Sequence, residues 1–186
     1  MEKVDIDKMG KNTFKAAKLL INNVLMIQDV ERINKLRYDS PKHFLKEYGT
    51  IKVCGPRRSG HTSCIPRIIF KYKLNPLVLS FNMHCSERLN RFMSHCIETG
   101  RGSGVFIRKY TKMSCIYYYE GVERDYTINF SSINCLSGCN GLSCDSIIVD
   151  MACMLKSEQI ESVYDLMVAK MRFMLVESHP LVIFLE

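Results

Sequence analysis

The chain has 186 residues, which at about 150 residues per domain corresponds to one domain. Hydrophobic residues make up 47% of it and charged residues 24%, a balance typical of globular proteins that excludes a disordered or low-complexity chain. Its apolar runs fall short of the roughly 18 residues that cross a bilayer, and the charged start MEKVDIDKMGKN does not fit a signal peptide. We therefore expect a cytoplasmic protein with one hydrophobic core and no membrane partner.

Lys and Arg together outnumber Asp and Glu by 26 to 19, which gives a formal net charge of +7. This excess favours anionic partners such as nucleotides or nucleic acid. The nine cysteines are an odd number and lie between Cys54 and Cys153 in largely apolar segments, unlike the even framework of a small secreted domain. The cysteines are therefore expected to be reduced thiols.

The first 48 residues are predicted to form a helical N-terminal extension that precedes an α/β domain over residues 49–186. Apolar residues recur every three or four positions over residues 12–37, which predicts an amphipathic helix capped by Asn12 or Thr13. Residues 41–48 predict a second, short helix with a proline in its first turn.

Apolar strands and helices then alternate along the chain. Strands are predicted at 51–54, 77–81, 146–150 and 181–185, and helices from the first loop to residue 72, at 86–98 and at 157–177. The alternation predicts an α/β fold with a mostly parallel sheet and flanking helices. Residues 100–130 instead combine turns with β-forming residues and predict an antiparallel β insertion. Pro66 is expected to kink or shorten the helix that contains it.

The segment GPRRSGHT, from Gly55 to Thr62, matches the phosphate-loop pattern G-x-x-x-x-G-K-[ST] except that His61 replaces the lysine. A predicted strand precedes it and a predicted helix follows. In this arrangement the backbone N–H groups of the loop and the N-terminus of the helix point toward a bound phosphate. Gly55 and Gly60 permit a tight turn, and the Thr62 hydroxyl is a magnesium ligand in such loops. The alternative is a plain turn between a strand and a helix.

The segment Ile147-Ile148-Val149-Asp150 has the form of a buried strand that ends in a magnesium-ordering aspartate. In the alternative interpretation, Asp150 is only the polar end of a buried strand. The two motifs occur in the expected order along the chain, and together they favour a nucleotide site.

With these two motifs the chain resembles the P-loop NTPases, and in particular the ATPase core of phage terminase large subunits and related helicase-like motors, over about residues 40–186. The segments LVLSFN, INFSS and CNGLSCDSIIVDMA add looser similarity. The resemblance implies that ATP and magnesium are the cofactors, with Thr62 on the magnesium and Asp150 in its inner or outer shell. It places on the triphosphate the loop residues Gly55, Arg57, Arg58, Ser59, Gly60, His61, Thr62 and Ser63.

The sequence departs from this family at two positions. His61 stands where the family has a lysine on the β and γ phosphates, and an imidazole with a pKa near 6.5 is mostly neutral at pH 7. Met151 stands where the family has its catalytic glutamate, and a thioether cannot deprotonate water. Asp150 and His61 are the predicted catalytic residues, with Arg57 or Arg58 as a substitute cation and Glu186 as a displaced base. The expected hydrolysis is weak or absent.

Two further clusters have competing interpretations. Residues 101–119 interleave Arg and Lys with Phe and Tyr, a mixture found in proteins that bind single-stranded nucleic acid and also in ordinary β-hairpins. The cysteines and histidines include the candidate zinc ligands Cys135, Cys139, Cys144, His84, Cys85, His95 and Cys96, but none forms a C-x-x-C pair. Buried free thiols are the alternative for these residues.

The function expected from the sequence is ATP binding by a variant P-loop, in a terminase-like or helicase-like ATPase core with weak or absent hydrolysis, linked to viral DNA handling. The partners expected are a nucleoside triphosphate, nucleic acid, and further copies of the chain or a larger viral assembly in the host cytoplasm. The alternative function is a non-catalytic interaction protein that binds nucleic acid or a protein partner on a degenerate P-loop scaffold.

Overall fold

The computed structural model of the chain describes residues 6–31, 40–55, 60–99, 104–171 and 179–186. The elements in chain order are α1 (Ile6–Glu31), α2 (Pro41–Tyr48), β1 (Thr50–Val53), α3 (His61–Tyr72), β2 (Pro76–Ser80), α4 (Met83–Glu98), β3 (Val105–Tyr110), β4 (Ser114–Tyr119), β5 (Asp125–Ser132), the 3-10 helix η2 (Ile133–Cys139), β6 (Ser146–Asp150), the short 3-10 turn η3 (Ala152–Met154), α5 (Ser157–Met171) and β7 (Leu181–Leu185).

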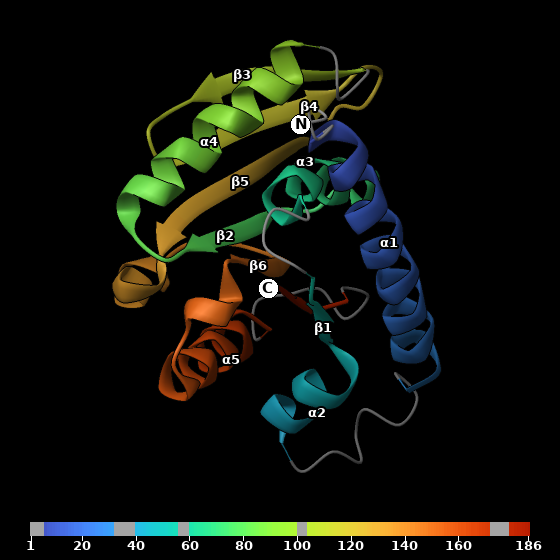
Figure 1. The fold of residues 1–186 in the computed structure, drawn as a ribbon, viewed down its shortest axis with the longest axis vertical. Coiled ribbons are helices and arrows are strands. Elements are labelled where there is room, and N and C mark those ends of the chain that lie inside the picture. The colour runs from blue at the N-terminus through green and yellow to red at the C-terminus, as the bar shows by residue number, and fades with distance from the viewer. Residues whose placement is uncertain (1–5, 32–39, 56–59, 100–103, 172–178) are drawn as a thin grey trace, which may run out of the picture.

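The strands form one seven-stranded sheet in the order β1-β7-β6-β2-β5-β4-β3 (Figure 1). The five strands β1, β7, β6, β2 and β5 are parallel, and β4 and β3 continue the sheet as an antiparallel wing. This arrangement confirms the predicted α/β fold with a mostly parallel sheet and flanking helices. The antiparallel part is smaller than the insertion predicted over residues 100–130, because β5 pairs in parallel with β2. Strand β7 lies between β1 and β6, so the segment after β1 and the end of β6 are one strand apart.

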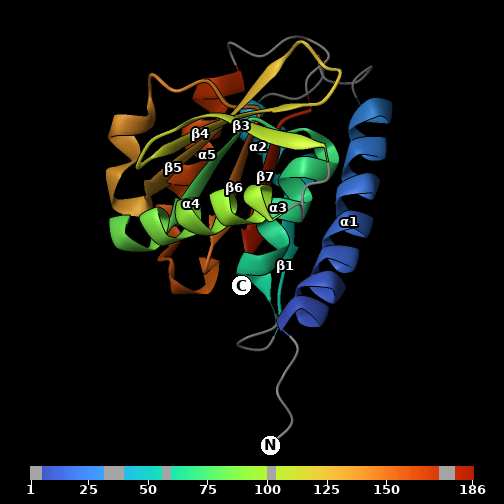
Figure 2. The ribbon, with the colours of Figure 1, turned by 90° about the horizontal axis from the view of Figure 1, so that it is seen from above.

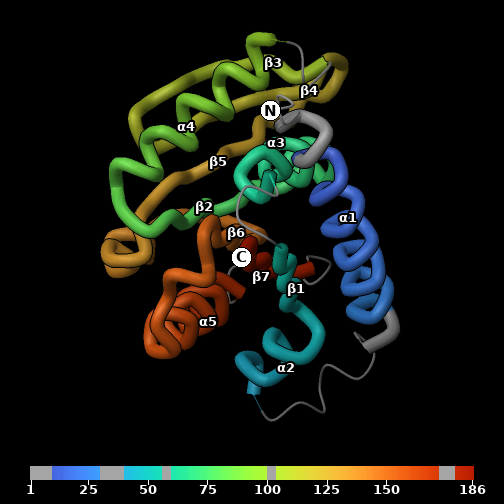
Figure 3. The backbone as a smooth tube through the Cα atoms, in the orientation of Figure 1, coloured from blue at the N-terminus to red at the C-terminus, as the bar shows by residue number. Residues whose placement is uncertain are grey.

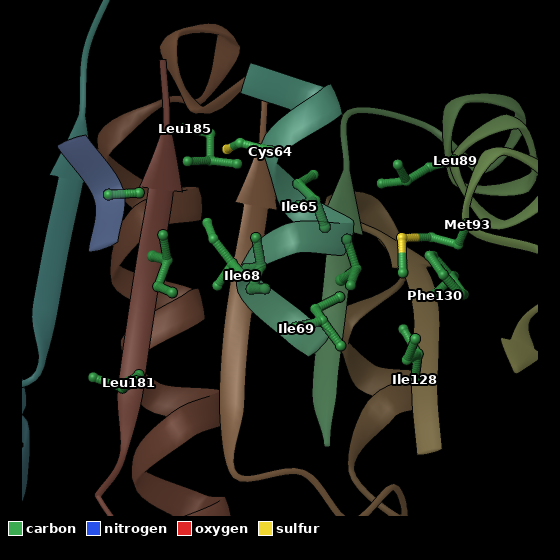
Figure 4. Close-up of a cluster of buried hydrophobic side chains, with 14 of the residues drawn as sticks. Cys64, Ile65, Ile68, Ile69, Leu89, Met93, Ile128, Phe130, Leu181 and Leu185 are labelled. Carbon is green, nitrogen blue, oxygen red and sulfur yellow. The ribbon is translucent and has the colours of Figure 1, made fainter. Parts of the chain in front are cut away.

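Helices cover both faces of the sheet. On one face α3 packs Cys64, Ile65, Ile68 and Ile69 onto the strands, and Met93 of α4 joins the same cluster (Figure 4). On the other face α5 and η2 cover a second cluster, to which α2 contributes Leu45. The three inner parallel strands β7, β6 and β2 are buried on both sides, which explains why their sequences are largely continuous apolar runs.

Helix α1 begins at Ile6 and not at a cap at Asn12 or Thr13, so that prediction was wrong. The buried face of α1 extends to Gly10, which packs directly on α3, and Thr13 is buried in the middle of the helix. This packing favours continued helix over a cap. Helix α1 lies along α3 (Figure 2), and residues 32–37 of the predicted helix lie outside the described residues.

Helix α3 continues through Pro66 to Tyr72, so the proline does not shorten the helix. Pro66 lies one turn after the start of α3, and its missing N–H leaves the Thr62 carbonyl without its helical partner. The ring of Pro66 is buried, and the apolar residues that follow it pack on the sheet. Tertiary packing therefore outweighs the local cost of the proline.

The tyrosines of the β insertion anchor this wing to the rest of the fold. The ring of Tyr117 contacts those of Tyr119 and Tyr126. The hydroxyls of Tyr117 and Tyr119 donate to the carbonyls of Leu74 and Phe70, at the end of α3, over 2.8 and 2.7 Å. These tyrosines are core residues, in agreement with the hairpin interpretation of this segment.

Candidate functional site

The candidate site lies at the carboxyl ends of β1, β7 and β6, where the N-terminus of α3 meets the sheet (Figure 3). The backbone of Gly55 donates to the carbonyl of Glu186 over 3.1 Å, which ties the start of the loop to the end of β7. At the other end Gly60 has a φ of 86° and caps α3, a conformation that glycine adopts without steric cost. The predicted loop residues Arg57, Arg58 and Ser59 lie outside the described residues.

Thr62 and Asp150 meet at this site. The Thr62 hydroxyl, in the first turn of α3, donates to the two carboxylate oxygens of Asp150 over 3.0 and 3.2 Å. Asp150 is the last residue of β6, and only 6% of it is exposed. The structure therefore brings together the hydroxyl and the carboxylate that the sequence assigned to magnesium. Ser63 follows in the same turn of α3 and is half-buried.

Burial raises the pKa of the Asp150 carboxyl above its usual range, while the hydrogen bond from Thr62 and one from the backbone of Met151 lower it in part. A buried carboxylate that accepts so few hydrogen bonds gains from a nearby cation. Carboxylate and hydroxyl oxygens are the donors that magnesium prefers, so the residues present fit this ion. Magnesium bound here would neutralise charge on the phosphates of a nucleotide.

His61 is the first residue of α3 and is half-buried. Burial lowers the pKa of its imidazole, and the nearby charge of Glu186 opposes this shift. Its ring is therefore mostly neutral at pH 7 in the ligand-free protein. Glu186 also accepts a hydrogen bond from the thiol of Cys54 at 3.3 Å, which raises the pKa of that thiol.

Met151 directly follows Asp150 and is 45% exposed. Its backbone adopts a left-handed conformation with a φ of 61°, which is uncommon for a residue with a side chain. The chain thus turns away sharply from β6 at Met151, the position that the sequence resemblance assigns to a catalytic glutamate. The thioether supplies no base there.

Ser80 is a polar residue at this edge of the sheet that the sequence analysis missed. It ends β2, the strand beside β6, and is 3% exposed. Its hydroxyl finds no hydrogen-bond partner among the residues that the structure describes. The sequence contained a signal for this residue, because a serine directly follows the apolar run Leu77–Leu79. Parallel strands bring their carboxyl ends to one edge of the sheet, so a polar residue at the end of such a run lies at the same edge as Asp150.

All nine cysteines are free thiols, as predicted. Within the described ranges, no group of three or more His, Cys, Asp or Glu side chains could hold a metal ion. The candidate zinc ligands therefore do not form such a group in that part of the chain. In the same ranges, no helix is long and apolar enough to cross a membrane.

Comparison with solved structures identifies proteins of the same fold. A variant of the large terminase ATPase domain of Thermus phage P74-26 aligns with a TM-score of 0.51 and 11% identity, over 74% of this chain and 58% of that chain. The large terminase of a thermophilic bacteriophage in complex with ATP-γ-S aligns with a TM-score of 0.51 and 12% identity, over 85% of this chain and 36% of that chain. The chain has the fold of a terminase ATPase domain.

This chain spans less than two thirds of either terminase structure. No protein-family profile matches its sequence, and no curated protein sequence matches it. The fold agrees with the resemblance seen in the sequence, and at this level of identity the agreement concerns the fold alone.

Proposed function

We propose that the chain binds a nucleoside triphosphate, ATP in the first instance, together with magnesium at the loop between β1 and α3. The observation that carries this proposal is the hydrogen bond from Thr62 to Asp150, between the helix that follows the loop and the end of β6. The fold supports it, because one terminase of this fold is described in complex with ATP-γ-S. In this proposal the backbone around Gly60 and the N-terminus of α3 hold the phosphates.

The proposed hydrolysis is weak or absent. Thr62 and Asp150 hold the magnesium, which supplies electrostatic stabilisation of the phosphates. His61 has a shorter and mostly neutral side chain in the place of the lysine, and Met151 offers no group that orients or deprotonates water. Binding without efficient turnover follows from these two residues. Arg57 and Arg58 remain proposed as substitute cations within the loop.

Titration calorimetry with ATP-γ-S, in the presence of magnesium and then of a chelator, tests this proposal. We expect binding that needs magnesium and that is lost in Thr62→Ala and Gly60→Asp, since the first removes a ligand and the second adds a charge and a side chain at a φ of 86°. Thr127→Ala, near the amino end of β5 and away from the carboxyl ends of the parallel strands, is the control and should bind as the wild type does. Absence of heat at millimolar nucleotide would refute the proposal.

The biological role proposed is viral DNA handling in the host cytoplasm, as part of an oligomer or a larger viral assembly. Helix α1 supports an assembly because it exposes two pairs of apolar residues at a spacing of seven: Leu19 with Met26, and Leu20 with Ile27. Such a stripe on a helix suits a protein contact. Light scattering over a concentration series tests it, and a monomer throughout would contradict self-assembly.

A second candidate function is nucleic-acid binding without catalysis, and the β insertion carries the observation that favours it. The rings of Phe106 and Tyr118 are stacked with their centroids 5.5 Å apart, and the guanidinium of Arg108 lies over the ring of Tyr118. Phe106 is 44% exposed, so an aromatic surface with a cation is open to stacked bases. Salt-dependent binding of single-stranded DNA that ATP does not change, and that Phe106→Ala weakens, would favour this function.

A further inference from the structure

Three polar side chains converge on the edge of the sheet where the proposed magnesium site lies, and only two of them contact each other. Thr62 donates to Asp150, whereas the Ser80 hydroxyl is buried without a partner among the described residues. A buried hydroxyl without a hydrogen bond is unfavourable in a folded protein. Its persistence beside a buried carboxylate therefore requires an explanation.

The strand register places Ser80 beside Asp150. Leu79 and Val149 are paired in the parallel ladder between β2 and β6, and Ser80 and Asp150 are the residues that follow them. Neighbouring strands in a sheet lie about 4.8 Å apart. The two residues therefore lie side by side on adjacent strands.

Both side chains lie on the same face of the sheet. Val78 and Ile148, two residues earlier on each strand, belong to the cluster that α3 covers, and alternate residues of a strand share a face. The hydrogen bond from Thr62 of α3 shows that Asp150 is on this face as well. Ser80 is thus directed to the same side of the sheet as the two proposed magnesium ligands.

We propose that Ser80 is a further residue of the cation site, whose hydroxyl binds a water molecule held by the magnesium ion between Thr62 and Asp150. This inference rests on the proposed function. Magnesium keeps several of its waters when it binds to proteins, and these waters need hydrogen-bond partners. The Ser80 hydroxyl makes no hydrogen bond to Asp150 among the described residues, and a single water can link two such groups. Ser80 then orders the hydrated ion without contacting the nucleotide.

The proposal predicts effects of opposite sign for the free and the loaded protein. Ser80→Ala removes a hydroxyl that has no partner in the ligand-free protein, so the midpoint of thermal unfolding in a chelator should rise. The same change should weaken magnesium-dependent binding of ATP-γ-S about 10-fold, the usual scale for loss of an outer hydrogen bond at a metal site. A residue with only a packing role would not produce this pair of effects.

Ser146→Ala is the matched control. Ser146 is also fully buried, at the opposite end of β6, but its hydroxyl donates to Asp145 over 2.8 Å. This variant should unfold at a lower temperature than the wild type and bind the nucleotide with unchanged affinity. The comparison separates the loss of a satisfied hydroxyl from the loss of an unsatisfied one.

Titration calorimetry with magnesium and ATP-γ-S, together with thermal unfolding in a chelator, decides among the outcomes. Weaker binding and higher stability in Ser80→Ala support the proposal. Equal binding by Ser80→Ala and the wild type would overturn the role of Ser80 and leave the nucleotide site intact. Lower stability of ligand-free Ser80→Ala would also overturn it, because the hydroxyl would then have a partner. A wild type that binds no nucleotide with magnesium would overturn both proposals.

Discussion

Gly10 of α1 and Ser63 of α3 approach so closely that a Cβ atom on Gly10 would lie 2.9 Å from the Cβ of Ser63. Ser63 directly follows Thr62, so the first turn of α3 has the N-terminal helix as its neighbour. The position of Thr62 relative to Asp150 therefore depends in part on α1. This contact is one of those that link the packing of the N-terminal helix to the geometry of the candidate site.

Gly10→Ala should destabilise the protein, although alanine favours a helix. Overpacking costs about 1–3 kcal/mol, whereas replacing glycine in a helix returns at most about 1 kcal/mol. We therefore expect a net loss of about 1 kcal/mol in the free energy of unfolding, measured by urea denaturation. The double variant Gly10→Ala/Ser63→Gly removes the opposing Cβ. Its loss in the free energy of unfolding should be smaller than the sum of the losses in the two single variants. Additive losses would show that the contact is not strained.

Asp150→Asn should stabilise the ligand-free protein and abolish the effect of magnesium on nucleotide binding. Burial raises the pKa of Asp150, so the folded protein holds this proton more tightly than the unfolded chain does. As the pH rises through the interval between the two pKa values, the wild type therefore loses stability, and the loss is complete above the folded value. The Asn variant lacks this loss, since its amide does not ionise.

Urea denaturation of both proteins in a chelator, from about pH 3 to about pH 7, checks this sign. The difference in unfolding free energy should grow with pH in favour of Asp150→Asn. Glu158→Gln, at the exposed start of α5, makes the same change of side chain at a carboxylate that is not buried, and is the control. An Asn variant that is less stable than the wild type at neutral pH would contradict the cost of burying this carboxylate.

The sequence predicted the mostly parallel sheet and the two segments that meet at the candidate site, because both depend on local patterns. The apolar runs 77–81 and 181–185 predicted buried strands, and a mostly parallel sheet followed from their alternation with helices. The meeting of Thr62 and Asp150 follows from the same order, because both lie at the carboxyl edge of the sheet.

The features that the sequence did not predict all depend on contacts between distant segments. Helix α1 starts before its expected cap because Gly10 packs on Ser63, which no local pattern reveals. Helix α3 passes through Pro66 because its buried side fits the sheet. Ser80 was missed because its burial and its lack of a partner arise only when β2 lies beside β6.

His61→Lys should increase the affinity for ATP-γ-S and remove its dependence on pH. A charged hydrogen-bond donor to phosphate is worth about 1.5 kcal/mol, which corresponds to roughly tenfold tighter binding. Wild-type affinity should rise as pH falls from about 8 to about 6, because phosphates favour the protonated imidazole. Burial lowers the pKa of His61, so most of the rise should occur near the lower end of this range.

Calorimetry at several pH values, with His61→Gln as a variant that cannot be protonated, measures this effect. The Gln variant should show a flat profile and weak binding, and the Lys variant a flat profile and tight binding. If the affinity of the wild type is as independent of pH as that of the Gln variant, the imidazole is not the cation that replaces lysine. Arg57 or Arg58 is then the better candidate.

Met151→Glu should introduce hydrolysis by restoring a carboxylate next to Asp150. A positioned general base contributes typically 10²–10⁴-fold, so we expect phosphate release from magnesium ATP to rise by about 100-fold over the wild type. The left-handed backbone at residue 151 is already strained with methionine, so glutamate adds little further cost. Met151→Gln has the same length and backbone without a base, and is the control. Equal rates for the Glu and Gln variants would mean that no attacking water lies within reach of residue 151. The direction of the backbone at Met151, and not only the missing carboxylate, would then account for the lack of hydrolysis.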